Sequence, residues 1–570
     1  MVSHGIISST RFRKTANYQP PLKDFSEGSG FRHFISTPAD EQRFSLNGKR
    51  FDPSDPAQWQ QAERLMSKLA FLIRFNPDPL KGKPNRNLPS GYTYFLQMVA
   101  HDLVHSTISA SLGDGQTSGL SNVRNAPLRL ETVYGGGPTE CPHAYEASRV
   151  AFRSKLRLGK SRSNAKDQNH KGSKKDIARG TTSTATELDQ QASYADALIA
   201  DPRNDSHAII SQMLVLFHEL HNFIVDELVR RGSLGPTENP YADAQRLFVA
   251  ARTACILVYR NLIRRDLLPR ILHRDVWEAY EKGQRLSHQF APGQWRAPLE
   301  FTNGFFRFGH SMIRPAYRFD ARSPTAFNIE QILNRTSDKS PSDVPLEAAW
   351  LVNWELFFSD NPDAGNVSIR IGPWSQVGIG EEVPGEGNLI ARDLLSSIAI
   401  QPWSVGHLVD RLRVTHGALL EKSEFLTATR DSRPWAERIE KWLTERSEAT
   451  HGTEFRLSRA EIQALANDPP IPFFARFEAG LDSGNDGERL GILGSIVVAD
   501  VIYGVLLHDR LLPDAPADGL QSQLAALSAA TVGRGNNIFA FLAGVEGPER
   551  RISMTTVCKF LGNRQRNNPA

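Results

Sequence analysis

The stretch Pro298-Leu-Glu-Phe-Thr-Asn-Gly-Phe-Phe-Arg-Phe-Gly-His-Ser-Met-Ile-Arg-Pro315 decides the fold. At helical period it carries two neighbouring apolar stripes, namely Phe301, Phe305, Phe308 and Met312, and beside them Phe306, His310 and Ile313. A helix that is apolar on two faces is buried, and Pro315 ends or kinks it. His310 is therefore expected on a buried helix among aromatic side chains, with no carboxylate in the same segment. It is either a core histidine bonded to a backbone carbonyl or a ligand to iron in an aromatic-lined pocket.

The overall composition is that of an ordinary folded protein. The chain has 570 residues, of which 40% are hydrophobic and 23% charged, so it can bury one large core or several. Its formal net charge of +4 is small for this length and gives no reason to expect a nucleic-acid partner.

The cysteines and the N-terminus bear on the compartment. Cys141, Cys255 and Cys558 lie far apart and show no CxxC spacing, which argues against a disulfide framework and for a reducing environment. The first residues contain no long apolar run of the kind found in secretory signals. We expect a cytoplasmic protein, while secretion by another route stays open.

One apolar run, Leu490 to Leu507, is barely long enough to cross a membrane. Asp500 stands near its middle, where an ionisable group is costly in lipid. We expect this run to form a buried core helix and the protein to have no membrane span.

The periodicity predicts one large, mainly helical domain with few short strands and no internal repeat. Residues 1–55 are rich in Pro, Gly and Ser and are expected to form an irregular arm, with the domain at 56–570. Residues 154–186 are basic and Ser-rich with almost no large apolar residues, which predicts a mobile insert. Helices are expected at 59–75, 92–108, 201–229, 243–265, 346–358, 388–400, 405–413, 435–446, 458–466 and 489–509.

His101-Asp102-Leu103-Val104-His105 is the first candidate chemical motif. Two histidines four residues apart on a helix can bind zinc, as in HExxH, where the Glu serves as base. Asp102 replaces that Glu here, and no third ligand stands out downstream. A zinc hydrolase through His101 and His105 is the remote alternative.

The second interpretation takes Gln97 and His101 together, one helical turn apart, facing a haem. As the O–O bond of a peroxide breaks, one oxygen must lose a proton and the other must gain it, and a neutral imidazole above iron can do both. A nearby cation such as Arg203 stabilises the charge on the leaving oxygen. His310 would then hold the iron from the opposite side.

Several motifs in order resemble those of the animal-type haem peroxidases, the peroxidase–cyclooxygenase superfamily, and most of all its bacterial branch. They are Gln97-(x)3-His101-Asp102, Asn122 to Pro138, Asp201-Pro-Arg-Asn-Asp followed by His221-Asn222, Arg307-Phe-Gly-His310, residues 389–395 and residues 487–494. Each motif alone is weak, but their order over about residues 85–510 is specific. The resemblance implies a mainly α, single-domain haem peroxidase fold.

The resemblance also implies roles on the two faces of the haem. His101 would be the distal acid–base, Arg203 the distal cation and Gln97 the distal amide. His310 would be the proximal ligand to the haem iron and Arg307 would face a haem propionate. Where the family orients the proximal imidazole with Asn, this chain has Asp393, a carboxylate that would strengthen donation to iron.

Departures from the family pattern imply a different cofactor chemistry. The positions that carry ester links to haem in the mammalian enzymes are Ala100 and Ser206, so we expect non-covalent haem b. Arg129 occupies a position where the family has a calcium ligand. Its guanidinium could pair with Asp102 in place of the cation, so we expect no calcium. A further propionate-facing Arg of the family is replaced by Ser396.

The expected function is that of a haem peroxidase in which hydrogen peroxide oxidises the haem to a ferryl species that takes electrons from small donors. A degenerate haem-binding or sensor protein is one alternative. A haem dioxygenase is another, although Arg307 occupies the place of the radical-forming Tyr of fatty-acid dioxygenases. Oxidation of phenols is expected rather than of halides, since a haem without covalent links should be less oxidising.

Overall fold

The computed structural model describes residues 30–75, 81–108, 120–162, 175–181, 195–287, 294–321, 323–363, 365–375, 389–427, 433–450, 452–482, 484–509, 511–512, 519–533 and 536–567. Over these residues the chain is mainly helical, and its strands pair only in twos. The predicted class, a mainly α fold with few short strands, is confirmed.

The longer helices are α2 (Pro56–Arg74), α3 (Gly91–Leu103), α5 (Ala208–Arg230), α6 (Pro240–Leu262), α13 (Leu389–Ala399), α14 (Val405–Leu420), α15 (Pro434–Glu448), α17 (Ile471–Leu481), α18 (Ile492–His508), α19 (Leu520–Val532) and α20 (Met554–Asn567). The shorter ones are α4 (Glu131–Tyr134), α7 (Leu268–Ile271), α8 (Arg274–Glu281), α9 (Leu299–Thr302), α10 (Ile329–Asn334), α11 (Trp354–Phe357) and α16 (Arg459–Asn467). Two 3-10 segments, η5 (Pro202–Asp205) and η7 (Phe305–Met312), matter for the site.

The strands are short and pair as β1 (Phe31–Arg32) with β11 (Ala297–Pro298), β2 (Ser45–Leu46) with β3 (Lys49–Arg50), β4 (Pro84–Pro89) with β14 (Val367–Ile369), β5 (Ser106–Ile108) with β6 (Leu120–Asn122), β7 (Leu158–Lys160) with β8 (Lys175–Ile177), β9 (Arg179–Thr181) with β10 (Ala195–Ala197), and β12 (Ala316–Arg318) with β13 (Ala326–Asn328). The β1–β11 pair is parallel and ties the start of the described chain to the residue before α9.

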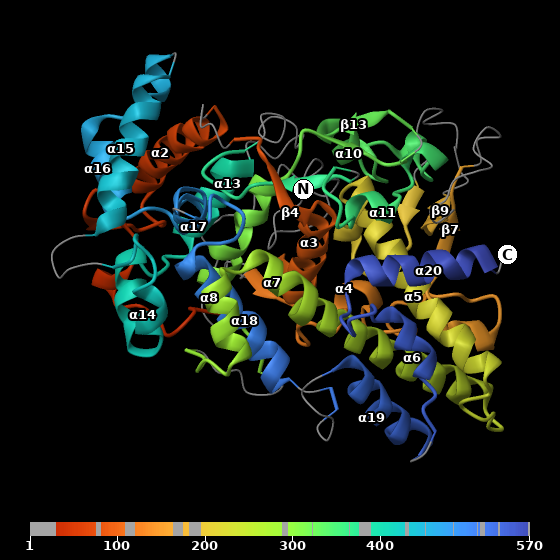
Figure 1. Ribbon diagram of the computed structural model, residues 1–570. Helices are drawn as coiled ribbons and strands as arrows, with labels where there is room; N and C mark the ends of the chain where they lie inside the picture. Colours follow the sequence, from red (N-terminus) through yellow and green to blue (C-terminus); the bar gives the residue numbers. More distant parts are fainter. Residues whose placement is uncertain are drawn as a thin grey trace, which may run out of the picture.

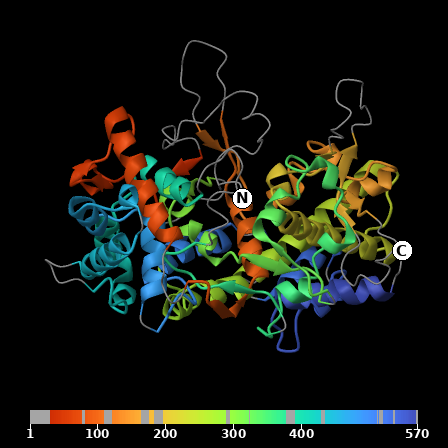
Figure 2. The same cartoon turned by 90° about the horizontal axis from the view of Figure 1, so that it is seen from above.

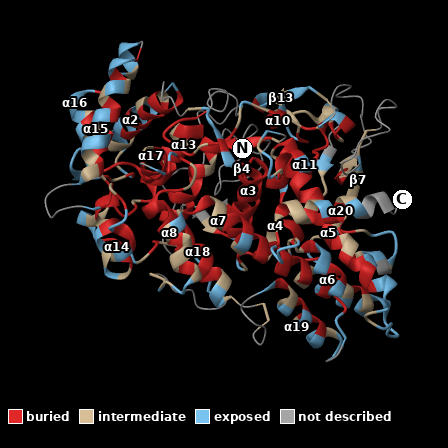
Figure 3. Ribbon diagram, in the orientation of Figure 1, coloured by how far each residue is buried: buried red, intermediate tan, exposed pale blue. Residues whose placement is uncertain are grey.

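Helix α3 runs through the middle of the molecule, between α5, α6, α19 and α20 on one side and α2 and α13 to α17 on the other (Figure 1). The view from above shows the same division of the helices (Figure 2). Burial follows this plan, because α3 is buried along its whole length whereas the outer helices expose one face (Figure 3). The site predicted on α3 therefore lies in the core.

Four predicted helices are shorter than expected or broken in the structure, and the one expected at 405–413 extends to Leu420. The helix expected at 92–108 ends at Leu103, the one at 201–229 is divided at 206–207, and the one at 346–358 is two short turns, η9 (Ala348–Trp350) and α11. The aromatic stretch that was expected to form one helix is divided at Gly304 into α9 and η7. Periodicity found the buried faces but missed these breaks, which tertiary contacts impose.

The two segments predicted to be irregular contain ordered structure where they are described. In the arm, Phe31, Phe34 and Phe44 are buried in the core. In the insert, β7 pairs with β8, and Asp176 and Arg179 form a buried ion pair with an N···O distance of 3.0 Å. The ends of the insert are therefore part of the fold, and its remaining residues, 163–174 and 182–186, lie outside the described residues.

Helix α18 forms a core helix, as expected for the apolar run. Its Asp500 accepts hydrogen bonds from the Tyr280 hydroxyl at 2.7 Å and the Ser287 amide at 2.9 Å. Among the described residues, α5 alone is long and apolar enough to cross a membrane, and 83% of its most apolar window is buried inside the protein.

Candidate active site

Helix α3 supplies the first part of the site. Gln97 and His101 lie one turn apart on it and are both buried. The helix ends because Val104 adopts an extended backbone, so His105 lies beyond it. The prediction that His101 and His105 share one helical face is therefore wrong, and no three His, Cys, Asp or Glu side chains of the described residues gather as a metal site.

The His101 imidazole is held by a neutral amide. Its Nδ1 lies 3.0 Å from Oδ1 of Asn204, whose Nδ2 donates to the carbonyl of Thr132 at 2.9 Å. That carbonyl only accepts, which fixes the Asn204 amide and makes His101 Nδ1 the donor, with the lone pair on Nε2. Burial and the nearby Arg203 guanidinium lower the pKa of His101 to about 3. The ring is therefore neutral and can act as a base through Nε2.

Arg203 lies beside His101, but its guanidinium binds the end of α3. It pairs with Asp201 at 2.7 Å and donates to the carbonyls of Val104 at 2.6 Å and His101 at 2.8 Å. Arg124 also pairs with Asp201 and donates to the His101 carbonyl at 3.0 Å. The distal cluster, defined as Asp201, Arg124 and Arg203, thus satisfies helix carbonyls that have no partner within the helix.

Gln97 is oriented by a histidine that the sequence motifs did not single out. His207 caps α5 by accepting the Ile210 amide at Nδ1, so its Nε2 donates to Gln97 Oε1 at 2.9 Å. The amide nitrogen of Gln97 is buried and has no hydrogen-bond partner among the described residues. A buried donor of this kind needs an acceptor, such as a water or a ligand oxygen.

Segment η7 supplies the second part of the site. A Cβ on Gly304, which separates α9 from η7, would lie 2.3 Å from the Glu300 carbonyl oxygen and 2.6 Å from Ile471 Cγ2, so only glycine fits. After this break the chain continues as a 3-10 helix and buries His310. This segment packs against α3, where a Cβ on Gly309 would lie 3.3 Å from the Leu96 side chain. His101 and His310 therefore stand on elements in direct contact.

Asp393 on α13 makes the contact that the resemblance implies. Its Oδ2 lies 2.6 Å from His310 Nδ1, so that nitrogen carries the proton and Nε2 carries the lone pair. Burial raises the pKa of Asp393, but the imidazole and two arginines outweigh it and hold the pKa well below its usual range. Burial lowers the pKa of His310, which Asp393 opposes.

Arg307 binds the same carboxylate, and the propionate-facing role expected of it stays a prediction. It donates to Asp393 Oδ1 at 2.9 Å and to Asn303 Oδ1 at 3.1 Å. Arg476 on α17, which sequence reasoning missed, donates to Asp393 Oδ2 at 2.8 Å. The proximal cluster, defined as Asp393, Arg307 and Arg476, surrounds the anchored nitrogen of His310.

Arg129 was expected to pair with Asp102, and this prediction is wrong. Arg129 pairs with Asp509, with its Nε at 2.9 Å, rather than with Asp102. Asp102 accepts the amides of Leu130 at 2.9 Å and Thr132 at 3.2 Å, and burial raises its pKa to about 6.

Ala100 and Ser206 are both within this region. Ala100 is buried on α3, next to His101. The Ser206 hydroxyl is buried without a hydrogen-bond partner among the described residues. Ser396 is buried on α13 and donates to the Asp393 carbonyl at 3.1 Å.

Part of the chain matches a known protein family. Residues 132–344 match the family model of the animal haem peroxidases, a range that includes Arg203, Arg307 and His310. No curated protein matches the chain by sequence.

Solved structures are similar in fold. Peroxidase A from Dictyostelium discoideum is 12% identical, with a TM-score of 0.55 over 91% of this chain and 99% of that one. The fatty acid alpha-dioxygenase of Oryza sativa is 13% identical, with a TM-score of 0.51 over 100% of this chain and 87% of that one. At these identities the likeness shows that this chain shares its fold with the two enzymes.

Proposed function

We propose that this chain, whose residues 132–344 match the family model of the animal haem peroxidases, is a peroxidase that uses hydrogen peroxide to oxidise small organic donors. Peroxidases and dioxygenases share the fold, so oxidoreductase chemistry is the broader conclusion. One observation carries the proposal. Two buried imidazoles on contacting elements are both anchored through Nδ1, His101 by a neutral amide and His310 by a carboxylate.

The residues present fit haem. His310, oriented by Asp393, would hold the haem iron through Nε2, since histidine is a common ligand to haem iron. The buried amide nitrogen of Gln97 is a donor without an acceptor among the described residues, and it could donate to a bound water or ligand oxygen. Bound haem would supply an iron centre that peroxide oxidises.

His101 would move the proton. Its neutral Nε2 takes the proton from one peroxide oxygen and returns it to the other as the O–O bond breaks. Arg203 supports this role by helping to keep the imidazole neutral, while the Gln97 amide donates to a water or to peroxide.

We infer that the haem is haem b, held without covalent links. Ala100 has no group that can form an ester, and Ser206 offers a hydroxyl rather than a carboxylate. Acid–organic extraction should remove the pigment from the polypeptide completely. Pigment that stays with the chain after extraction would reject this part of the proposal.

We also infer that the calcium site of the family is not used. Backbone amides already bind both oxygens of Asp102, whose raised pKa further weakens it as a ligand. After desalting, metal analysis should find far less than one calcium per chain. A calcium content near one per chain would contradict the inference.

A cytoplasmic location remains part of the proposal. All three cysteines are free in the structure, as suits a reducing compartment. Residues 1–29, which bear on secretion, lie outside the described residues.

The donors that we propose are small phenols and similar compounds, not halides. The dioxygenase alternative has the support of the shared fold with the rice enzyme. Against it, Arg307 stands where the resemblance places a radical-forming Tyr, and its guanidinium is bound to Asp393. Fatty-acid oxygenation with dioxygen and no turnover with peroxide and phenols would favour the dioxygenase.

Three histidine variants test the proposal. His310→Ala should lose haem or its strong absorption band, and His101→Ala should keep haem but react with peroxide about 10²–10⁴ times more slowly. His105→Ala is the matched control and should react normally, whereas a zinc hydrolase would need it. A wild-type protein that binds haem but does not react with peroxide would be a degenerate binder or sensor.

A further inference from the structure

A buried aromatic cluster lies next to the distal side and has no part in the function proposed above. It consists of Tyr134 on α4, His221 on α5, Phe248 on α6 and Tyr145. The Tyr134 ring centroid lies 5.2 Å from that of His221 and 5.9 Å from that of Phe248, which lies 5.6 Å from Tyr145. All four side chains are buried.

Tyr134 is hydrogen-bonded to a base, the imidazole of His221. Its hydroxyl lies 3.1 Å from Nδ1 of His221, whose Nε2 lies 2.8 Å from the Ser154 carbonyl. Since that carbonyl only accepts, Nε2 carries the proton and Nδ1 accepts from the Tyr134 hydroxyl. Burial lowers the pKa of His221 to about 4, so the imidazole is neutral and can take a proton.

Tyr145 provides a contrast within the same cluster. Its hydroxyl donates to the backbone carbonyl of Tyr134 at 2.8 Å, and an amide carbonyl does not accept a proton from a phenol. A tyrosine that loses an electron becomes a strong acid and must lose its proton too. Tyr134 has a base for that proton and Tyr145 does not.

Tyr134 is also linked to the distal histidine. Two residues before it, Thr132 donates its amide to Asp102 and accepts the Asn204 amide on its carbonyl. Asn204 in turn binds the His101 imidazole. A short path of covalent and hydrogen bonds therefore joins Tyr134 to the proposed haem site.

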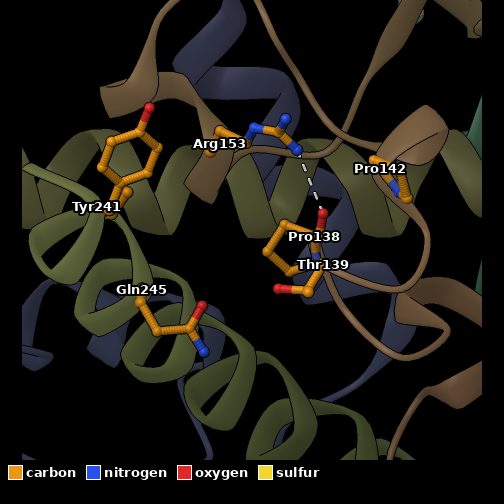
Figure 4. Close-up of a pocket in the computed structure, with 7 residues that line it drawn as sticks. Pro138, Thr139, Pro142, Arg153, Tyr241 and Gln245 are labelled. Atoms are coloured by element: carbon orange, nitrogen blue, oxygen red, sulfur yellow. Dashed lines mark hydrogen bonds between the residues drawn. The ribbon is translucent and has the colours of Figure 1, made fainter.

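On its other side the cluster adjoins a surface pocket. The pocket has a volume of about 460 Å³ and is lined by Pro138, Thr139, Pro142, Arg153, Tyr241, Ala244 and Gln245. Figure 4 shows the Arg153 guanidinium beside Pro138, whose carbonyl accepts from Arg153 at 3.3 Å, and the Tyr241 ring apart from them on the other side of the view. Gly137, the residue before Pro138, lies against Phe248, because a Cβ on Gly137 would lie 3.4 Å from Phe248 Cε1. The volume of the pocket, the Tyr241 ring and the Arg153 guanidinium suit a small phenol that carries an acidic group.

We propose that Tyr134 is a redox-active residue that passes electrons from a phenolic donor in this pocket to the haem. The inference rests on the proposed function, which supplies a peroxide-oxidised haem as the oxidant. In the first step one electron leaves Tyr134 for the haem and the phenolic proton moves to His221 Nδ1. In the second step the donor gives one electron to the Tyr134 radical, His221 returns its proton, and the donor releases its own proton to water.

Freeze-quench electron paramagnetic resonance tests the relay. When the haem-loaded protein meets peroxide without donor, it should form an organic radical whose signal narrows with ring-deuterated tyrosine. This narrowing separates it from a radical on Cys255, whose thiol interacts with the Tyr134 hydroxyl. Tyr134→Phe should reduce the signal at least tenfold, His221→Gln should slow its formation, and Tyr145→Phe, the matched control, should keep it. The haem absorption spectrum of each variant confirms that it is folded and loaded.

A radical that persists in Tyr134→Phe, or that Tyr145→Phe removes equally, would overturn the relay. In both cases the peroxide reaction of the haem would still be normal. A wild-type haem that does not react with peroxide would instead reject the proposed function, and the relay with it.

The pocket is tested separately through the donor. Tyr241 is 67% exposed, so Tyr241→Ala should fold normally and raise KM for an acidic phenol about fivefold, as expected from a loss of roughly 1 kcal/mol of binding. Val414→Ala, at a position that is also exposed and lies on the distant helix α14, is the control and should leave KM unchanged (Figure 1). An unchanged KM in Tyr241→Ala would reject this pocket as the donor site.

Discussion

The distal and proximal sides of the site both combine an imidazole, a carboxylate and two arginines, but they arrange them differently. On each side one buried carboxylate binds two arginines, Asp201 in the distal cluster and Asp393 in the proximal cluster. Only the proximal carboxylate contacts an imidazole, at 2.6 Å, while the distal imidazole is bonded to the neutral Asn204.

This difference matches what each imidazole would have to do. An iron ligand donates more strongly when its other nitrogen faces a negative charge. An acid–base group must gain and lose a proton easily, and an adjacent carboxylate would hold the proton on it. The distal carboxylate is instead used to position arginines at the end of α3.

The largest effect is expected from Asp393→Asn, because it leaves two buried arginines without a counter-charge. The cost should be about 3–5 kcal/mol of unfolding free energy, and haem affinity should fall about 10–100-fold. Urea unfolding and haem titration measure the two quantities. Asp201→Asn is the matched variant: it should lose similar stability but keep the proximal iron–histidine bond. Equal effects of both variants on that bond, observed by resonance Raman spectroscopy, would remove the contrast.

Arg476→Met should have the next largest effect. It removes one of the charge-assisted hydrogen bonds to Asp393, at a cost of about 2 kcal/mol of unfolding free energy. It also leaves more negative charge on Asp393, beside His310. The ferric–ferrous midpoint potential should therefore fall, as measured by spectroelectrochemistry. Arg124→Met on the distal side is the control, with a comparable loss of stability and no change in potential. A potential that rises in Arg476→Met would contradict this assignment.

Asn204→Asp would give the distal side the proximal arrangement. The new carboxylate should raise the pKa of His101 from about 3 and favour the imidazolium, which cannot act as a base. The wild-type peroxide rate should be independent of His101 titration between pH 5 and 8, whereas the variant should lose rate as the pH falls. The loss is about tenfold for each unit by which the raised pKa exceeds the pH, equivalent to about 1.4 kcal/mol. A flat stopped-flow pH profile in the variant would show that the neutral amide is unimportant.

The smallest effect is expected at the edge cluster, defined as Asp509, Arg129 and Arg260. It repeats the pattern of one carboxylate and two arginines, but the Arg129 side chain is 33% exposed. Arg129→Ala should cost about 1 kcal/mol or less, since solvent screens the pair and Asp509 keeps Arg260. It should also leave the calcium content unchanged. A loss of stability as large as that of Asp393→Asn would mean that the difference in burial does not explain the different importance of the two clusters.

Sequence reasoning reached several residues of the site by their order along the chain. Gln97 and His101 were placed one helical turn apart, and the contact of Asp393 with His310, which lie 83 positions apart, is present in the structure. It failed for Arg129, whose partner Asp509 lies 380 positions away, and for His105, which lies beyond the end of α3. Asn204, His207, Arg124 and Arg476 were not singled out, although Asn204 stands within the quoted Asp-Pro-Arg-Asn-Asp motif.

The sequence by itself determined the helical class, the buried faces and the two candidate histidines. These features depend on neighbours within one or two turns, which periodicity and motif order record. Only the tertiary structure decided where helices break and which group each buried side chain binds. A buried charge or imidazole must find a partner, and that partner is supplied by whichever element packs against it.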